Sequence, residues 1–221
     1  DILFIDSSHV LKLDSDVMYY FTKIFPLLQK DVLIHVHDIF LPYDYPLDWL
    51  KQGKILLHPT EGVWGIGCDA FNATAVNKIN ALKQREASKS LIILAPTIHD
   101  SLKYFQPLSE IQTNFLETIW PGHTTVIFES NSLVPSHIKA SDNSIAMRVS
   151  NHKPIKELLA KFKSLMVSTS ANISNQPTPI TAAEALEIFP EPDVALYDFE
   201  NGSANKPSAI IDLKTMDYLR E

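Results

Sequence analysis

The sequence has little cysteine, no long apolar run and no excess of basic charge. Cys68 is its single cysteine among 221 residues, so no disulfide can form within the chain, as is typical of proteins from a reducing compartment. No apolar run reaches the ~18–20 residues that a membrane-spanning helix needs, so we expect no membrane partner. The sequence around Cys68 shows no His and Asn in a pattern that would activate a nucleophile. We therefore interpret Cys68 as a buried structural thiol.

The charge is unevenly distributed along the chain. Residues 1–50 hold three Lys and eight Asp, whereas the rest of the chain holds 16 basic and 18 acidic residues. Neither part has the strongly basic character of a protein that binds nucleic acid over a large surface. A local basic groove around Lys83, Arg85 and Lys89 fits a nucleotide better than a duplex. An apolar fraction of 45% with 20% charged residues is that of an ordinary globular protein.

Residues 1–48 read as a separate βαβ-type fragment. Apolar patterns predict strands over 2–6 and 32–38 and an amphipathic helix over 15–29. The segments 5–9 and 35–42 resemble the C-terminal half of a class I, S-adenosylmethionine-type methyltransferase, although the glycine-rich cofactor turn of those enzymes is absent. Because this fragment cannot bury both faces of a sheet alone, we expect no catalytic role for it.

Three histidines and an aspartate in this fragment raise the question of a metal site. His9, His35, His37 and Asp38 are metal-ligand types. Side chains alternate along a strand, so that only His35 and His37 share a side. We therefore favour structural polar residues and predict no metal site here.

The remainder, residues 49–221, predicts an α/β fold. Pro42 and Pro46 break the preceding pattern and mark the junction. Strands and helices then mix without strict βαβ alternation, which favours a twisted mixed sheet flanked by helices. Strands are expected over 54–58, 91–95, 124–129, 144–149, 165–170 and 209–213, and helices over 47–53, 72–83, 108–119, 154–162 and 182–189.

Two polar clusters far apart in the sequence predict a binding site. Lys83 and Arg85 follow the end of an expected helix, while Ser168, Ser170 and Asn172 alternate along an extended segment, so their side chains can face one cavity. Arg offers a planar fork for phosphate or carboxylate oxygens, Lys a compact charge, and Ser and Asn neutral hydrogen bonds. This combination suits a polyanionic substrate. The alternatives are a solvated charge pair at the helix end and a turn closed by Ser and Asn side chains.

These clusters belong to a series of six ordered segments over some 170 residues. In that order the chain resembles the TsaC/YrdC family, the threonylcarbamoyl-AMP synthases, in their short, single-domain bacterial form. The matching segments are Pro59-Thr-Glu-Gly-Val-Trp-Gly-Ile-Gly-Cys-Asp69, Leu82-Lys-Gln-Arg85, Trp120-Pro-Gly122, Ser144-Ile-Ala-Met-Arg-Val149, Ser168-Thr-Ser-Ala-Asn172 and Asn205-Lys-Pro-Ser-Ala-Ile-Ile-Asp212.

The resemblance implies a reaction as well as a fold. Members of that family condense L-threonine, bicarbonate and ATP to threonylcarbamoyl-AMP and pyrophosphate, for threonylcarbamoyladenosine modification of tRNA. It implies Mg²⁺ bound with ATP, a cytoplasmic location, and contact with tRNA and with a complex that transfers the threonylcarbamoyl group. Phosphoryl transfer depends mainly on positioning and charge neutralisation.

The resemblance also assigns roles to individual residues. It implies that Arg148 anchors the threonine carboxylate through a bidentate fork; the alternative for Arg148 is a surface ion pair. The implied catalytic residues are Lys83, Arg85, Ser170 and Asn172. ATP would be bound by Lys83, Arg85, Lys89, Ser144, Ser170, Asn172, Thr178 and Arg220, and threonine by Thr60, Arg148, Ser168 and Ser208.

Several residues near these motifs admit more than one interpretation from the sequence. The hydroxyl of Thr60 can bind substrate or cap its own turn. Trp64 and Trp120 are more typical of core aromatics than of stacking platforms. His58 and His123 lie beside motifs, yet the reaction needs no obvious histidine base. Many longer relatives carry Thr where this chain has Gly62, so a hydroxyl contact to threonine is replaced here by backbone or missing.

Three other functions compete with the synthase. A double-stranded RNA or tRNA binding module could use the same concave surface, although the near-neutral charge of the second part weighs against it. A carbamoyl-transfer domain from hydrogenase maturation would carry zinc-finger-like cysteines, for which a single cysteine leaves no room. A methyltransferase would need the missing cofactor turn.

Overall fold

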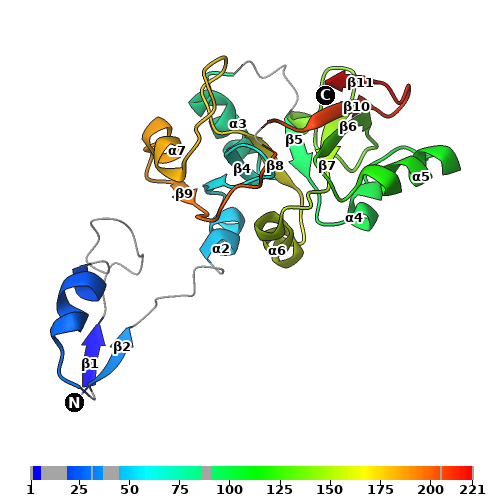
Figure 1. The fold of residues 1–221 in the computed structure, drawn as a ribbon. Coiled ribbons are helices and arrows are strands. Elements are labelled where there is room, and N and C mark those ends of the chain that lie inside the picture. The colour runs from blue at the N-terminus through cyan, green and yellow to red at the C-terminus, as the bar shows by residue number, and fades with distance from the viewer. Residues whose placement is uncertain are drawn as a thin grey trace. The chain divides into compact units, whose positions relative to one another are not determined.

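The fold is described from a computed structural model of the whole chain. The structure describes residues 2–5, 19–30, 32–36, 45–85, 91–204 and 206–220. The chain divides into two compact units, Asp1–Tyr45 and Pro46–Glu221 (Figure 1). Within the described ranges, no helix combines the length and apolar character required to cross a bilayer.

The first unit contains a two-stranded parallel sheet. Strand β1 (Ile2–Ile5) pairs with β2 (Leu33–Val36). The described part of the helix expected over 15–29 is a π-helix, Tyr20–Ile24, followed by a 3₁₀ helix, Phe25–Leu27. Pro26, which lacks a backbone N–H, stands in the 3₁₀ turn, where a continuing α-helix would need that donor.

Most of the candidate metal ligands of this unit lie outside the described residues. His9, His37 and Asp38 lie beyond the described ranges, and only the backbone of His35 is described. In the part of the chain that the structure describes, no group of three or more His, Cys, Asp or Glu side chains could hold a metal ion.

The second unit is built on a nine-stranded sheet in the order β11-β10-β6-β7-β5-β8-β4-β3-β9. Three neighbouring pairs, β10–β6, β5–β7 and β3–β9, are parallel and the others antiparallel. The predicted twisted mixed sheet with flanking helices is therefore confirmed. The strands are β3 (Ile55–His58), β4 (Gly65–Asp69), β5 (Ile92–Leu94), β6 (Thr124–Glu129), β7 (Ser144–Arg148), β8 (Met166–Ser170), β9 (Val194–Leu196), β10 (Ala209–Asp212) and β11 (Tyr218–Arg220).

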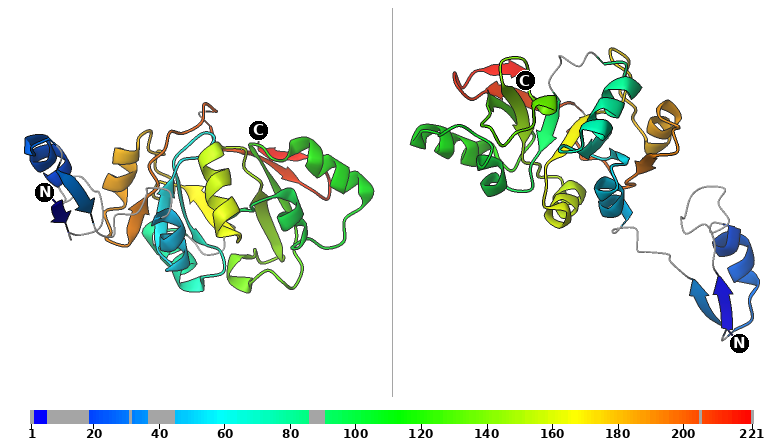
Figure 2. Two further views of the ribbon diagram at one scale, coloured as in Figure 1. Left: turned by 90° about the horizontal axis from the view of Figure 1, so that it is seen from below. Right: turned by 180° about the vertical axis from the view of Figure 1, so that it is seen from behind.

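The helices of this unit pack in two groups on opposite faces of the sheet. One group holds α3 (Ala73–Leu82), α5 (Glu110–Ile119) and α7 (Ala182–Ile188), and the other α2 (Tyr45–Lys51) and α6 (Lys153–Phe162). Figures 1 and 2 show α2 and α6 next to each other. Because side chains alternate along each strand, Val167 packs with the first group and Met166 with the second. Cys68, Trp64 and Trp120 are buried in the first core, as predicted.

Five short elements were not predicted from the sequence, among them the 3₁₀ helix Ser136–Ile138. Strands β9 and β11 have three residues each and helix α4 (Ile98–Leu102) five, too few for a periodic pattern. Strand β4 contains Gly65 and Gly67, a residue type depleted in strands. A Cβ on Gly65 would lie 2.4 Å from Cε1 of His58 on the neighbouring strand. Glycine in β4 therefore leaves room for the buried His58 ring.

Candidate functional site

A cavity of about 260 Å³ opens on the sheet face that also carries α2 and α6. Residues of neighbouring strands form its floor: Gly65 of β4 pairs with Ser170 of β8, and Ile92 of β5 pairs with Ala146 of β7. Ile127 of β6 and Ile210 of β10 also belong to the lining. The charged and hydroxyl residues among its described lining are Arg85, Arg148, Arg220, His123, Thr60, Ser168, Thr169, Ser170, Thr178 and Ser208, with no carboxylate and no lysine.

Most of the predicted site residues meet at this cavity. Lys83 and Asn172 lie directly behind it, bonded to Ser170 or its neighbours. Ser144 instead lines an adjacent hollow with Glu129 and Asp142, and Lys89 lies outside the described residues. The predicted residues that line the cavity are Thr60, Arg85, Arg148, Ser168, Ser170, Thr178, Ser208 and Arg220.

The end of helix α3 directs Lys83 and Arg85. Gln84 has a left-handed backbone with φ 49°, and its N–H donates to Ala81 O while the N–H of Arg85 donates to Asn80 O at 2.9 Å. This pair of bonds is a Schellman motif, which ends a helix and reverses the chain. The motif places Lys83 beneath the end of β8 and carries Arg85 to the cavity wall.

Lys83 binds the backbone at the end of β8. It is 1% exposed, and its Nζ donates to the carbonyl oxygens of Ser170 and of Asn172, the latter at 2.6 Å. The hydroxyl of Ser170 donates to Asn172 Oδ1 at 2.6 Å, and Ser174 N donates to the carbonyl of Lys83. The Lys83 ammonium thus fixes the segment that carries the hydroxyl and amide groups.

No carboxylate balances this ammonium among its described partners. Burial, and secondarily the charge of Arg85, lowers the pKa of Lys83 to about 8. Backbone carbonyls stabilise the charged form only through their dipoles. Lys83 is therefore a cation whose charge is lost slightly above neutral pH.

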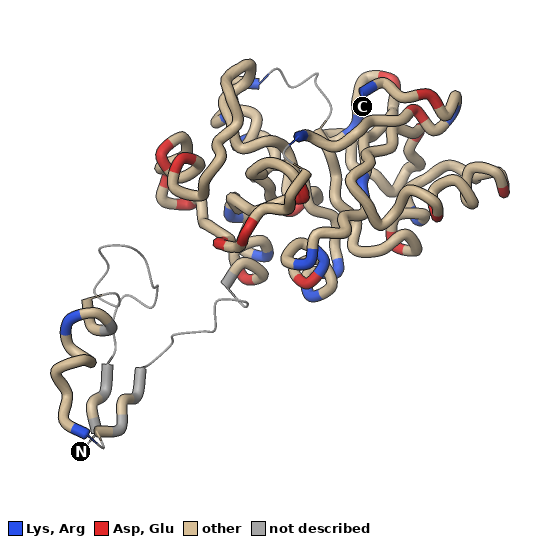
Figure 3. Tube along the Cα trace, viewed as in Figure 1, with Lys and Arg blue, Asp and Glu red and all other residues tan. Residues whose placement is uncertain are grey.

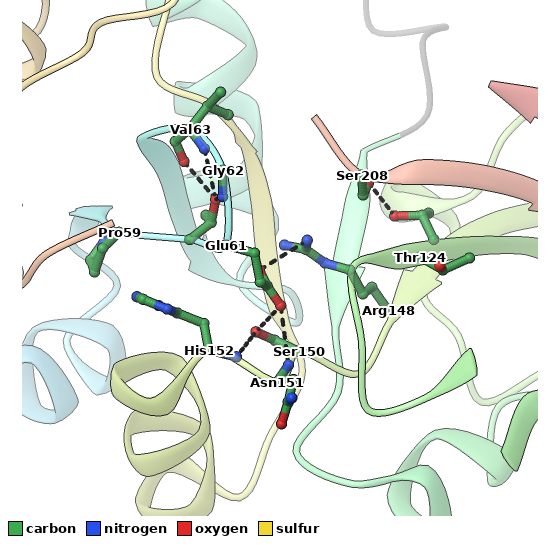
Figure 4. A network of polar contacts seen from close by, with 12 residues as sticks. Pro59, Glu61, Gly62, Val63, Thr124, Arg148, Ser150, Asn151, His152 and Ser208 are labelled. Carbon is green, nitrogen blue, oxygen red and sulfur yellow. Dashed lines mark hydrogen bonds and ion pairs between the residues drawn. The ribbon is translucent and has the colours of Figure 1, made fainter. Parts of the chain in front are cut away.

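Arg148 at the end of β7 forms a buried ion pair with Glu61. Arg148 Nη1 lies 3.1 Å from Glu61 Oε2, and the two side chains are 5% and 13% exposed. The other carboxylate oxygen of Glu61 accepts from Ser150 Oγ at 2.7 Å and from Asn151 N at 3.1 Å. Figure 4 shows Glu61 between Arg148 and the Ser150–Asn151 segment. The pair is buried, so the alternative of a surface ion pair for Arg148 is wrong.

The contacts of Glu61 keep it ionised. Burial by itself raises its pKa, but the Arg148 charge and the hydrogen bonds from Ser150 and Asn151 outweigh that effect and hold the pKa of Glu61 below its usual range. Arg148 Nε is buried and has no hydrogen-bond partner in the described structure. A buried donor of this kind is suited to a ligand oxygen.

Thr60 caps the turn before β4. Its Oγ1 donates to Val63 O at 2.6 Å and accepts from the N–H groups of Gly62 and Val63 at 3.2 Å each. A Cβ on Gly62 would lie 2.1 Å from the carbonyl oxygen of Lys206, so the close approach of the two segments requires glycine at this position. Thr60 lines the cavity while its hydroxyl proton is used within the turn.

The opposite side of the cavity is formed by β10 and β11. Arg220 donates through Nε and Nη2 to Ser208 O, at 3.0 and 2.6 Å. Ser208 Oγ lies 2.8 Å from Thr125 Oγ1. Arg220 thus closes the sheet edge against Ser208 and contributes a third guanidinium to the lining.

Two histidines near the motifs differ in accessibility. His58 is fully buried, its Nδ1 lies 3.0 Å from Pro59 O, and burial lowers its pKa to about 4. His123 lines the cavity. Sequence reasoning assigned no role to Glu61 or His123. Their positions in the sequence could have indicated a role: Glu61 is next to Thr60, and His123 directly follows the Trp120-Pro-Gly122 segment.

The chain is similar in sequence to a known protein family and to several curated relatives. The family model described as "Telomere recombination" (Sua5, YciO, YrdC) matches residues 48–221. The chain is 35% identical over 181 residues to a threonylcarbamoyl-AMP synthase of Vibrio campbellii, covering 81% of this chain and 98% of the relative. It is 38% identical over 178 residues to one of Pseudoalteromonas atlantica, covering 80% and 91%.

A solved structure shares the fold. The P. abyssi Sua5 structure complexed with L-threonine superposes with a TM-score of 0.72 at 25% identity. The match covers 78% of this chain and 51% of that protein.

Proposed function

The chain belongs to the Sua5/YciO/YrdC family, and on this premise we propose that it is a threonylcarbamoyl-AMP synthase. The reaction condenses L-threonine, bicarbonate and ATP and releases pyrophosphate. Relatives at 35–38% identity bear that name, and the chain covers 91–98% of the two described above.

The observation that carries the proposal is the composition of the cavity. Arg85, Arg148 and Arg220 converge on it with hydroxyl groups, and no carboxylate belongs to its described lining. The site therefore attracts an anion and repels no part of it. ATP, bicarbonate and the threonine carboxylate are all anions, and a cavity of this size is close to those that bind small molecules.

The geometry supports the binding of the triphosphate at one wall of the cavity and of the threonine carboxylate at the other. Arg85 and the hydroxyl of Ser170 lie on the wall fixed by Lys83 and suit the triphosphate. Arg148, whose Nε is available, suits the threonine carboxylate, and Ser168 belongs to the same lining. The carbamate oxygen of carboxylated threonine then attacks the α-phosphorus, and the bond to pyrophosphate breaks.

Magnesium is part of the proposal as a companion of ATP. Because the described lining offers hydroxyls but no carboxylate, Mg²⁺ would be held mainly by phosphate oxygens and water, as it commonly is with nucleotides. It would neutralise charge on the leaving pyrophosphate. Hydroxyl groups of the lining, Ser170 and Thr178 among them, would hydrogen-bond to its water shell.

The wider context is also proposed. The single cysteine and the nucleotide substrate fit a cytoplasmic enzyme, whose product passes to a threonylcarbamoyl-transfer complex that modifies tRNA. We retain the hypothesis that residues 1–48 derive from a methyltransferase-like fragment without a catalytic role, and that the synthase occupies residues 49–221.

The experiment that tests the function is a pyrophosphate-release assay with ATP, bicarbonate and Mg²⁺, with and without L-threonine. We expect release that depends on threonine and is much weaker with L-serine, which lacks the methyl group. Release that does not respond to threonine would contradict the proposal.

The RNA-binding alternative finds less support. Figure 3 shows Lys and Arg positions interspersed with Asp and Glu positions over the second unit, whereas a duplex binder presents a continuous basic stripe. Steeply salt-dependent binding of double-stranded RNA, without threonine-dependent turnover, would favour the alternative.

A further inference from the structure

We propose that His123 is a catalytic residue that accepts the proton which the α-ammonium group of threonine must lose before carboxylation. The inference rests on the proposed function and concerns its first chemical step. It differs from the expectation drawn from the sequence, in which no histidine base was needed.

The first argument is the chemistry of the cavity lining. A protonated amine is not a nucleophile, so a group in the cavity must take its proton. Within the described lining, the polar side chains other than His123 are guanidinium and hydroxyl groups and the Trp64 indole. Guanidinium groups hold their own protons, and neutral hydroxyls are very weak bases. The imidazole of His123 is the group among them that binds a proton near neutral pH.

The second argument is the rigid placement of residue 123. The N–H of Gly122 donates to Val149 O at 2.8 Å, and the carbonyl of His123 accepts from Ala209 N at 3.2 Å. Trp120 Nε1 donates to Thr124 O at 2.7 Å. The backbone on both sides of His123 is thus bonded to neighbouring elements, and the imidazole lines the cavity.

The third argument is the charge around the imidazole. The charged groups that face it are Arg148 of β7, Glu61 of the turn before β4, Lys206 of the segment before β10, and Arg220 of β11. Burial and then Arg148 lower the pKa of His123, with Glu61 opposing them and Lys206 and Arg220 adding to them. The lowered pKa favours the neutral imidazole, which has a lone pair to accept a proton.

The same cations favour removal of the substrate proton. A threonine ammonium group in a cavity lined by Arg85, Arg148 and Arg220 is destabilised by like charge relative to the free amine. The transfer moves a positive charge from the substrate to His123. The negative charge of Glu61 stabilises the imidazolium that forms there.

The step balances as follows. The threonine –NH₃⁺ gives one proton to His123, leaving –NH₂ and an imidazolium. The amine nitrogen forms a bond to the carbon of bicarbonate, and water leaves, which yields the N-carboxylate with one negative charge. His123 then releases its proton to solvent through the open cavity.

The test uses the full chain with His123→Gln, which has a similar size and polarity but cannot bind a proton near neutral pH. We expect pyrophosphate release at pH 7.5 to fall by about 100-fold or more, the usual range for loss of a general base. ATP and L-threonine should still bind within about threefold of wild type by calorimetry, because no ligand-holding cation is removed.

The pH profile separates catalysis from a structural role. Wild-type kcat/KM should decline as the pH falls through the lowered pKa of His123, since protonation removes the base. His123→Gln should lack this acidic limb, whereas His99→Gln, a change of an exposed histidine on α4, should retain it. In His123→Ala, added imidazole should restore part of the rate, and it should not do so in Arg85→Ala.

The outcomes are distinct. Wild type without threonine-dependent pyrophosphate release contradicts the proposed function itself. An active wild type with His123→Gln turnover and acidic limb unchanged overturns the role of His123 and assigns the proton to solvent. A lower rate accompanied by lost ATP binding, an unaltered pH profile and no imidazole rescue overturns it in favour of a structural role.

Discussion

Arg148 and Lys83 are both buried cations at the same cavity, yet their charges are compensated differently. Arg148 faces the Glu61 carboxylate at 3.1 Å, and that carboxylate is itself held by Ser150 and Asn151. Lys83 faces the carbonyl oxygens of Ser170 and Asn172, with no carboxylate among its described partners.

The difference determines how each wall responds to pH and to mutation. The Arg148 wall keeps its charge over the whole physiological range, because the pKa of Glu61 is held low and arginine does not deprotonate. On the other wall, Lys83 loses its charge near pH 8, while Arg85 keeps its own. The threonine side of the proposed site is therefore fixed, whereas the nucleotide side is sensitive to pH.

The largest expected effect comes from Glu61→Gln, which breaks the compensated wall. An uncompensated buried arginine should lower the free energy of unfolding by about 3–5 kcal/mol. The variant should also raise KM for threonine more than KM for ATP, because Arg148 loses its orientation. Chemical denaturation and steady-state kinetics measure both effects.

The matched control is an exposed ion pair of the same unit. Lys78 and Asp193 pair with side chains 39% and 42% exposed, and Asp193→Asn should cost no more than about 1 kcal/mol. Equal costs for Glu61→Gln and Asp193→Asn would show that Glu61 is not the essential counter-ion of Arg148.

A slightly smaller effect is expected from Arg85→Ala, which tests whether the second wall contacts the nucleotide. Loss of a charge-assisted donor should reduce transition-state stabilisation by about 2–4 kcal/mol. The value of kcat/KM for ATP should then fall by roughly 30- to 1,000-fold. The circular-dichroism melt should stay within a few degrees of wild type. Undiminished turnover would exclude Arg85 as a phosphate ligand.

Lys83→Met tests the pH sensitivity of the uncompensated wall. Wild-type activity should fall as the pH rises through about 8, because the ammonium of Lys83 then loses its charge. Lys83→Met should have low activity without that basic limb. A wild-type profile that is flat up to pH 9.5 would mean that the Lys83 charge is not required.

The stability of the same pair of proteins provides an independent check. The unfolded chain holds the Lys83 proton up to the ordinary pKa of 10.5, whereas the folded chain releases it near 8. The free energy of unfolding of wild type, relative to Lys83→Met, should therefore increase as the pH rises from 8 to 10.5. Denaturant titrations at several pH values measure this difference.

The smallest effect is expected from Ser150→Ala. This change removes the hydrogen bond from Ser150 Oγ to the Glu61 carboxylate and the bond that Ser150 Oγ accepts from His152 N. It leaves the Asn151 N–H bond to Glu61 and the Arg148 contact in place. It should lower the free energy of unfolding by about 1 kcal/mol and leave KM for ATP unchanged. A loss as large as that of Glu61→Gln would mean that Ser150, rather than Arg148, is the main partner of Glu61.

The long periodic elements were predictable, and the short ones were not. Helix α3 shows its apolar Ala75, Val76 and Ile79 on one face, a pattern that the sequence displays directly. Strand β4 escaped prediction because its glycines meet neighbours across the sheet: Gly65 leaves room for the His58 ring, and a Cβ on Gly67 would lie 2.1 Å from the carbonyl oxygen of Val167. A tertiary contact determined those residues, so local propensity could not reveal the strand.

The candidate site was only partly predictable for a similar reason. Arg85, Arg148 and Ser170 were identified by charge, hydrogen-bonding type and motif order, and they line one cavity. Ser144 lies on the same strand as Arg148, four residues earlier, and lines another hollow. A motif gives the order of residues along a strand and not the extent of the cavity above it.

Residue types, their periodicity and their order were enough to predict the fold class, the family and the polyanion-binding character. The folded chain was needed to show that Glu61 neutralises Arg148, that carbonyl oxygens hold Lys83, and that His123 lines the same cavity as the arginines. Glu61 and Arg148 are 87 residues apart, as the numbering shows, and electrostatic energy depends on distance and burial in space rather than along the chain.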